Sequence, residues 1–249
     1  MKAELKRQII DWAERYETDS FIPSDPISFP HRWQSKRDIE ISGFITSWLS
    51  FGNRKQILCV CEQIDSLFSD AGSPYLYIQG DEWQQYEHNS ATLYRWLKWS
   101  DFHRMCSLLH SLYTHYSDME AMVLDMRGNT PLRNDQSPLV VSLCRYFKGC
   151  SHFGSENSTC KRLDMFLRWM VRDGSPVDFG LWKQCNPREL IIPLDTHVGA
   201  MARELGITLR KSNDLKMALE ITAAMAKVFP DDPVKGDFAL FGKGIEEKD

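Results

Sequence analysis

The sequence lacks the features that mark membrane, secreted and repeat proteins. No apolar run approaches the ~20 residues that span a bilayer. The N-terminal segment MKAELKRQIIDWAERYE predicts an amphipathic helix and has no apolar core of the kind found in signal peptides. Internal repeats and low-complexity tracts are missing as well. We therefore expect a globular protein that resides in the cytoplasm and has no membrane partner.

Cysteine is present, but without a pattern typical of disulfides or metal sites. The seven cysteines are scattered along the chain, which fits the reduced thiols of a cytosolic protein better than disulfides. Cys144, Cys150, His152 and Cys160 could in principle form a tetrahedral zinc site. Their spacings of six, two and eight residues match no compact zinc knuckle. We therefore expect no bound metal.

The net charge is small and unevenly distributed. A formal net charge of −4 argues against a protein that coats nucleic acid unspecifically. Between residues 145 and 216, twelve Lys and Arg stand against eight Asp and Glu, so this segment carries +4 and the remainder −8. A basic segment on an acidic body suits a local site for a polyanion. A chance imbalance of surface charge explains the same count equally well.

Helical signals dominate the chain, and no β signal competes with them. With 249 residues, 43% of them hydrophobic, the chain can bury a substantial core. We expect one helical domain, 1–249, with a possible lobe boundary near residues 130–137. No segment shows sustained alternation of β-branched residues between hairpin turns, so no sheet is expected. The predicted fold class is all-α.

Cap residues predict where several helices begin. Ser35 predicts a helix that continues to about Ser50, and the Gly52-Asn53 break predicts a second helix behind it. Three further starts place a cap residue directly before proline, which is suited to the first helical position. These pairs are Ser137-Pro138, Asn186-Pro187 and Asp232-Pro233.

Two segments each place one ionisable side chain at an expected helix start. Lys161 opens CKRLDMFLRWMVR, and Asp195 precedes the helix of IIPLDTHVGAMARELG. Burial and the positive end of a helix dipole disfavour an ammonium, so Lys161 could supply a nucleophilic amine. A buried carboxylate at Asp195 could stabilise a forming cation. The simpler alternatives are a solvated first-turn lysine and a plain N-cap aspartate.

These residues carry a resemblance to a known superfamily. The segment LDTHV before a helix, with a lysine at the start of an earlier helix, resembles the helix-hairpin-helix (HhH-GPD) DNA glycosylases. The 34 residues from Lys161 to Asp195 are similar to the spacing of the archaeal 8-oxoguanine DNA glycosylase (AGOG) branch. From about Asp25 to Ile245, the chain resembles an uncharacterised bacterial family placed in that superfamily. The segments that carry this match are PHRW, ISGFITSWLSFGNRKQI, CKRLDMFLRWMVRDG, GLWK, LIIPLDTHV, RKSNDLKMALEIT and DPVKGDFALFG.

The resemblance implies a helix-hairpin-helix DNA glycosylase-like fold of two interlocked helical lobes and an enzyme of base-excision repair at the nucleoid. Such an enzyme swings a damaged nucleotide, here an oxidised purine such as 8-oxoguanine, out of double-stranded DNA. Lys161 would displace the base and form a Schiff base that permits β-elimination, the AP lyase step. Asp195 would stabilise the oxocarbenium charge and assist deprotonation of the amine. No cofactor and no obligate protein partner are implied.

The chain also departs from the superfamily pattern. The glycine hairpin L-P-G-V-G-x-K is replaced by GSENSTC before Lys161. Ala200 stands where members often have an arginine, and Arg203, one turn further along, could contact DNA in its place. No cysteine follows Cys185, so the iron-sulfur cluster of the endonuclease III branch cannot form.

Further residues are candidates for DNA contacts, each with a structural alternative. Asn53, Arg54 and Lys55 open a helix and could hold a phosphate, or they could form a cap with solvated charges. His197 could contact the DNA backbone or pack as an interfacial histidine. The extruded base could stack on a wall formed by three aromatic side chains, which at helical spacing could equally be core. These side chains are Trp169, Phe238 and Phe241.

Two other classes of function stay open at this stage. A non-catalytic DNA-binding module on the same scaffold would bind DNA without forming an adduct. An enzyme that cleaves the glycosidic bond of a free nucleoside would turn over without duplex DNA. Borohydride trapping on damaged DNA separates these classes from a glycosylase.

Overall fold

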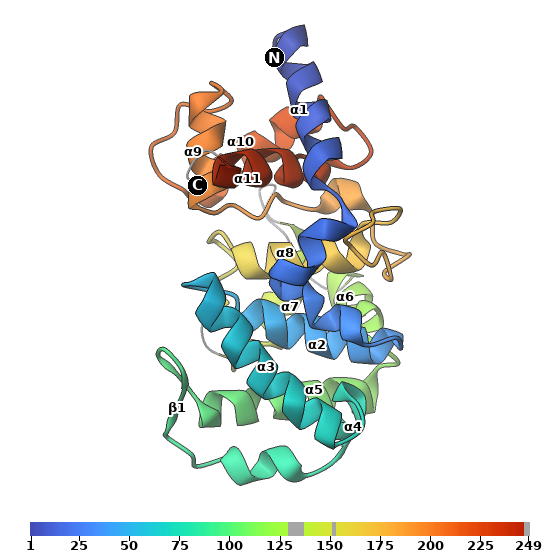
Figure 1. The fold of residues 1–249 in the computed structure, drawn as a ribbon. Helices are drawn as coiled ribbons and strands as arrows, with labels where there is room; N and C mark the ends of the chain where they lie inside the picture. Colours follow the sequence, from blue (N-terminus) through green and yellow to red (C-terminus); the bar gives the residue numbers. More distant parts are fainter. Residues whose placement is uncertain (129–136, 151–152, 247–249) are drawn as a thin grey trace. The chain divides into compact units, whose positions relative to one another are not determined.

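The computed structural model describes residues 1–128, 137–150 and 153–246, and most of them lie in helices (Figure 1). The predicted all-α class is therefore confirmed. The α-helices are α1 (Ala3–Tyr16), α2 (Lys36–Leu49), α3 (Arg54–Asp70), α4 (Pro74–Gln79), α5 (Trp99–His115), α6 (Met119–Gly128), α7 (Pro138–Tyr146), α8 (Lys161–Val171), α9 (Thr196–Glu204), α10 (Leu215–Met225) and α11 (Gly236–Glu246). Short 3-10 turns connect several of them: η1 (Asp19–Ser24), η2 (Pro26–Ser28), η3 (Pro30–Arg32), η4 (Glu82–Tyr86), η5 (Pro187–Glu189) and η6 (Pro233–Lys235).

One short hairpin departs from the expectation that the chain has no sheet. Strands β1 (Thr92–Tyr94) and β2 (Leu97–Lys98) pair antiparallel, with Tyr94 opposite Leu97. That expectation is wrong for this segment. The strands are three and two residues long, too short for the alternating pattern by which a strand is recognised in sequence.

Most of the cap predictions are confirmed, because the cap side chains make the expected hydrogen bonds. Ser35 accepts from the Asp38 backbone N–H at the start of α2, and Asn53 caps α3. The three proline signals differ in outcome. Ser137-Pro138 begins the α-helix α7. Asn186-Pro187 and Asp232-Pro233 begin the 3-10 turns η5 and η6, and only the second leads directly into an α-helix, α11. Proline fixes the dihedral angle of a first turn but does not decide how many turns follow.

The chain divides into two compact units, each formed by segments that are distant in sequence. Unit 1 comprises Met1–Phe21, Pro131–Val141 and Gly154–Asp249. Unit 2 comprises Ile22–Thr130 and Ser142–Phe153. The lobe boundary expected near 130–137 falls, except for residue 137, outside the residues that the structure describes.

Unit 1 has a core to which both ends of the chain contribute. Helix α1 packs against α11, and α11 packs against α9. Burying this many apolar side chains supplies the main driving force for folding of the unit. The buried core residues are Ile9, Ala13, Ile191, Ile192, Leu194, Val198, Met201, Ala202, Met217, Ala218, Ile221, Met225, Val228, Ala239 and Leu240.

Unit 2 is built around α2, which is buried along almost its whole length from Ile39 to Leu49. Helices α3 and α4 pack against it, and α5 packs against α4. The buried carboxylate of Glu40 accepts hydrogen bonds from the Tyr113 hydroxyl at 2.9 Å and the Met119 backbone N–H at 3.0 Å. Within the described part of the chain, no helix has the length and apolar character needed to cross a membrane.

Candidate active site

Lys161 and Asp195 meet in unit 1. The Lys161 Nζ lies 3.6 Å from the Asp195 Oδ2, although 34 residues separate the two in sequence. Lys161 is the first residue of α8, and Asp195 is the N-cap of α9, as the sequence predicts. The structure therefore brings together the two side chains to which the resemblance assigns one reaction.

Local sequence explains why each side chain stands where it does. The apolar residues Leu163, Phe166 and Leu167 bury one side of α8, so the helix starts next to the core. The buried segment Ile191–Leu194 leads directly into Asp195. The Asp195 Oδ1 accepts a hydrogen bond of 2.8 Å from the Val198 backbone N–H, which fixes the carboxylate at the helix start.

The two carboxylate oxygens of Asp195 make different interactions. Oδ1 caps α9, and Oδ2 faces the amine of Lys161. A separation of 3.6 Å is longer than the 2.7–2.9 Å typical of a charge-assisted hydrogen bond, so the pair interacts mainly through charge. The Lys161 side chain is 36% exposed and Asp195 13%. The amine can therefore be reached from solvent while its carboxylate partner is largely shielded, an arrangement that suits attack on an electrophilic carbon.

A third group, Asp237 in the first turn of α11, belongs to the same electrostatic cluster. Its buried carboxyl accepts a hydrogen bond of 2.5 Å from the Arg168 Nη1. Burial raises the pKa of Asp237 to about 6; Arg168 and Lys161 oppose the rise, and the charge of Asp195 adds to it. A carboxyl that titrates near neutrality and senses both Lys161 and Asp195 is suited to proton exchange with this pair.

A fourth group, Asp164, lies one turn beyond Lys161 on α8. Burial, together with the Cys160 thiol and the Asp237 carboxyl, raises the pKa of Asp164 well above its ordinary value. Its Oδ1 has no hydrogen-bond partner among the described residues. Burial disfavours the charged form of such a carboxyl. The site thus contains one amine, at Lys161, and three carboxyl groups, at Asp195, Asp237 and Asp164.

Two buried arginines, Arg168 of α8 and Arg172 directly after it, contact further carboxylates next to this cluster. Arg172 donates to the carboxylates of Asp178 at 2.5 Å, Glu17 at 2.7 Å and Asp232 at 2.8 Å. The Arg168 Nε lies 3.3 Å from Asp178. The loop that carries Asp178 passes so close to α8 that a Cβ on Gly180 would lie 2.8 Å from the Arg172 carbonyl oxygen. Only glycine fits at that point, so the loop depends on it to bring Asp178 to both arginines.

Sequence reasoning missed these buried groups, although one signal for them exists. Lys161, Asp164, Arg168 and Arg172 recur every three or four residues, which places them along one side of α8. A polar stripe inside a helix with an otherwise apolar pattern indicates a buried ionic network. Asp237 has no such local signal, because its partners lie on α8 and before α9.

The structure gives Arg203 and His197 packing roles. Arg203 donates to the backbone carbonyls of Arg210 at 2.7 Å and Lys211 at 2.9 Å, and it also bonds Asn213. It therefore holds the loop after α9. The His197 Nδ1 lies 3.1 Å from the Gly244 carbonyl, which places the ring between α9 and α11. The packing alternative raised for His197 fits this geometry, and Arg203 is engaged rather than available for a phosphate.

The predicted aromatic wall for the extruded base is not consistent with the burial of its side chains. Trp169 is 0% exposed and Phe238 1%, so a base cannot stack on either ring in this conformation. The guanidinium of Arg168 lies 4.4 Å from the Phe238 ring centroid, and that of Arg172 lies 5.3 Å from it. Phe241 is half-buried and lies edge-on to His197. Trp169 and Phe238 are therefore core residues, and the interpretation of them as a wall for the base is wrong for this conformation.

Unit 2 contains the three residues predicted to contact a DNA phosphate, Asn53, Arg54 and Lys55. Lys161 and Asp195 belong to unit 1. The Asn53 side chain accepts from the backbone N–H of Lys55 at 3.0 Å, so it acts as an N-cap. The Arg54 Nη2 lies 3.5 Å from Asp25, and Lys55 is exposed. A helix cap with charged neighbours accounts for this local geometry.

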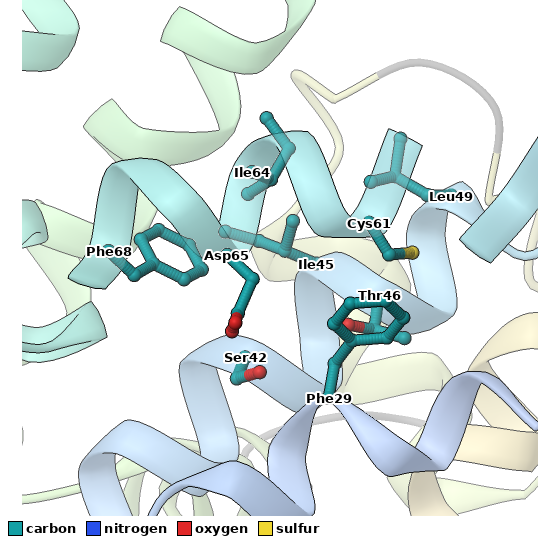
Figure 2. A pocket seen from close by; sticks show the side chains of 9 residues that line it. All are labelled: Phe29, Ser42, Ile45, Thr46, Leu49, Cys61, Ile64, Asp65 and Phe68. Carbon is teal, nitrogen blue, oxygen red and sulfur yellow. The ribbon is translucent and has the colours of Figure 1, made fainter. Parts of the chain in front are cut away.

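Unit 2 also holds a small cavity between η2, α2 and α3 (Figure 2). Its empty volume of about 180 Å³ includes open solvent, so the cavity encloses no room for a ligand. Neither Lys161 nor Asp195 lines it, and its Asp65 carboxylate already accepts from Arg32 at 2.7 Å and the Trp33 indole at 3.1 Å. The lining residues are Phe29, Ser42, Ile45, Thr46, Leu49, Cys61, Ile64, Asp65 and Phe68. This cavity is not a site for a nucleobase.

Among residues 1–128, 137–150 and 153–246, no group of three or more His, Cys, Asp or Glu side chains is placed to hold a metal ion. His152, a member of the cysteine and histidine set considered above, lies outside the described residues.

Asp237 gives the folding stability a defined pH dependence. Its pKa of about 6 in the folded state exceeds the ordinary 3.8, so the folded protein retains a proton that the unfolded chain releases. The stabilisation from this proton is complete below pH ~4 and is lost as the pH rises through about 6. Relative to Asp237→Asn, the wild type should lose on the order of 2–3 kcal/mol of unfolding free energy across this interval. Urea unfolding at a series of pH values measures the difference, and parallel curves for the two proteins would contradict it.

Comparison with known proteins gives a family but no activity. The searches of curated proteins and of solved structures returned no match. One family model matches residues 25–246, and its description reads "Protein of unknown function (DUF2400)". This match spans nearly all of the chain, including Lys161, Asp164, Asp195 and Asp237. The chain therefore belongs to the DUF2400 family.

Proposed function

We propose that the protein is a DNA glycosylase with AP lyase activity, which removes an oxidised purine of the 8-oxoguanine type from double-stranded DNA. The observation that carries the proposal is the 3.6 Å approach of the Lys161 Nζ to the Asp195 Oδ2 at the starts of two helices. The resemblance of LDTHV and the upstream lysine to helix-hairpin-helix glycosylases supports it. The proposal includes the more specific fold, a helix-hairpin-helix arrangement of two interlocked lobes.

The reaction begins with a proton transfer. The Lys161 ammonium gives a proton to a neighbouring carboxylate and becomes a neutral amine. The amine nitrogen then forms a bond to the anomeric carbon of the damaged nucleotide. The glycosidic bond breaks with its electron pair on the base, which leaves as it takes up a proton. Asp195 stabilises the positive charge that develops on the sugar during this step.

The covalent intermediate leads to strand cleavage. Opening of the sugar ring gives a Schiff base between the Lys161 nitrogen and the former anomeric carbon. Loss of a proton from the neighbouring sugar carbon then expels the 3′ phosphate by β-elimination. Asp237 is suited to receive a proton in this sequence, because its carboxyl is half ionised near pH 6.

The experiment is reductive trapping on damaged DNA. The protein is incubated with duplex DNA that contains either 8-oxoguanine or an abasic site, in the presence of borohydride and EDTA. The expected result is a covalent protein–DNA adduct, and digestion followed by mass spectrometry should locate the modification on Lys161. Binding of duplex without any adduct on either substrate would instead favour the DNA-binding module. Turnover of a free nucleoside without duplex would favour the third class of function.

A further inference from the structure

The main chain of Asp195 is held by a side chain from outside its own helix. The Asp195 carbonyl oxygen accepts a hydrogen bond from the Gly199 N–H at 3.0 Å, as expected for the start of α9. It accepts a second one from the side-chain amide of Asn213, whose Nδ2 lies 3.2 Å away. Asn213 belongs to the loop between α9 and α10. A carbonyl oxygen has two lone pairs, so it can accept from both donors at once.

The amide of Asn213 has a defined orientation. Its Oδ1 accepts a hydrogen bond from the Arg203 Nη2, and a guanidinium can only donate. Its Nδ2 donates to the Asp195 carbonyl, which can only accept. Arg203 also donates to the backbone carbonyls of Arg210 at 2.7 Å and Lys211 at 2.9 Å, so the arginine is itself fixed by the loop. The Asn213 side chain therefore connects a fixed arginine to the N-cap residue of α9.

A glycine in α9 leaves the space for this amide. A Cβ on Gly199 would lie 2.7 Å from the Asn213 Oδ1 and 2.9 Å from its Nδ2, and both distances are too short for a real Cβ contact. Glycine inside a helix costs about 1 kcal/mol relative to alanine. Asp195, Gly199 and Arg203 follow one another at intervals of four residues, which places them along one side of α9. Asn213 lies against that side, in the space that the glycine provides.

The direction of the Asp195 carboxylate depends on the helix start rather than on Lys161. Its Oδ1 accepts from the Val198 N–H at 2.8 Å, whereas the Lys161 Nζ stays 3.6 Å from Oδ2. At that distance the pair interacts mainly through charge, which constrains the angle of the carboxylate less than a hydrogen bond does. A shift in the Asp195 main chain would therefore move Oδ2 relative to the amine.

We propose that Asn213 is a positioning residue of this site, which keeps the Asp195 carboxylate directed at the sugar that Lys161 attacks. Arg203 orients the Asn213 amide, and Gly199 gives it room beside the Asp195 carbonyl. This inference rests on the proposed function, because it assigns to Asn213 a role in that reaction that is exerted through Asp195.

The experiment measures the rate of adduct formation and the affinity for DNA separately. Asn213→Ala should lower the single-turnover rate of borohydride trapping on duplex DNA with an abasic site by roughly 10- to 100-fold. The Kd for the same duplex should stay unchanged, measured by fluorescence anisotropy in the Lys161→Gln background so that no turnover occurs. Ser212→Ala is the matched control, because Ser212 is the exposed neighbour of Asn213 in the same loop. It should change neither quantity.

A second variant displaces the amide without removing it. Gly199→Ala raises the helix propensity of α9, so a slower reaction cannot result from a weaker helix. Its methyl group should push the Asn213 amide away from the Asp195 carbonyl, and the trapping rate should fall about as far as for Asn213→Ala. The double variant should be no slower than Asn213→Ala alone, because the contact is already lost. Additive losses, or a wild-type rate for Asn213→Ala, would overturn the proposal.

A measurement without DNA keeps this test separate from that of the glycosylase activity. The Val198 amide proton exchanges when its hydrogen bond to the Asp195 Oδ1 opens. Asn213→Ala should speed this exchange, followed by NMR in heavy water, by roughly 2- to 10-fold, and Ser212→Ala should not. Unchanged exchange at Val198 would overturn the positioning role even if the wild type forms the adduct. Faster exchange in a protein that forms no adduct would support the contact to Asp195 while the glycosylase proposal fails.

Discussion

Lys161→Gln is expected to abolish the borohydride-dependent adduct on DNA that contains an abasic site. Glutamine has no amine to form a Schiff base, so the yield should fall to background, a loss of at least about 10³-fold in the rate of trapping. The helix start should persist, because the Lys161 side chain is 36% exposed and glutamine has a helix propensity similar to that of lysine. Gel electrophoresis of the reduced mixture measures the adduct.

The matched control is Lys183→Gln in the same unit. Lys183 is an exposed lysine whose amine lies 2.6 Å from Asp173, so it is also paired with a carboxylate. Its replacement should leave the adduct unchanged. Asp195→Asn separates charge from structure, because asparagine is an equally good N-cap and keeps the acceptor for the Val198 N–H. A wild-type level of adduct from Lys161→Gln would exclude this lysine as the nucleophile.

The second large effect concerns Arg172 and the free energy of unfolding. Arg172→Met would leave the carboxylates of Glu17, Asp178 and Asp232 without their shared cation. Removing one partner of a buried ionic network typically costs about 3–5 kcal/mol, because the remaining charges stay desolvated. Urea denaturation followed by circular dichroism should therefore show a much lower midpoint for this variant.

Arg188→Met provides the comparison for Arg172. Arg188 pairs with Asp231, but both side chains are mostly exposed, at 59% and 85%. A surface pair of this kind contributes about 0–1 kcal/mol. Equal losses for the two variants would show that the network around Arg172 gives no more stability than a surface ion pair.

The sequence was sufficient for the helix starts because a cap acts over three residues. Ser35, Asn53 and Asp195 each bond a backbone N–H two or three positions further on, so their signals are local. The approach of Lys161 to Asp195 was predictable only through the resemblance to glycosylases. Periodicity alone places both residues at helix ends but does not bring those ends together.

The rest of the site depends on contacts between distant segments. Asp237 gains its raised pKa from burial and its hydrogen bond from Arg168, 69 residues away, and neither is encoded near it in sequence. The sequence around Trp169 and Phe238 does not distinguish side chains that line a pocket from side chains that fill a core, and both prove to be buried. The β1–β2 hairpin has too few residues for a periodic pattern, so its two strands were not predicted.

Unit 1 combines segments that precede and follow most of unit 2 in sequence, so the order of synthesis limits when unit 1 can fold. Helix α1 is synthesised before unit 2, whereas its partner α11 is synthesised after it. Most of unit 2 lies between them and can fold while translation continues. The cluster of Lys161, Asp195 and Asp237 can therefore assemble only after α11 has been synthesised, by which time all of unit 2 is already present in the growing chain.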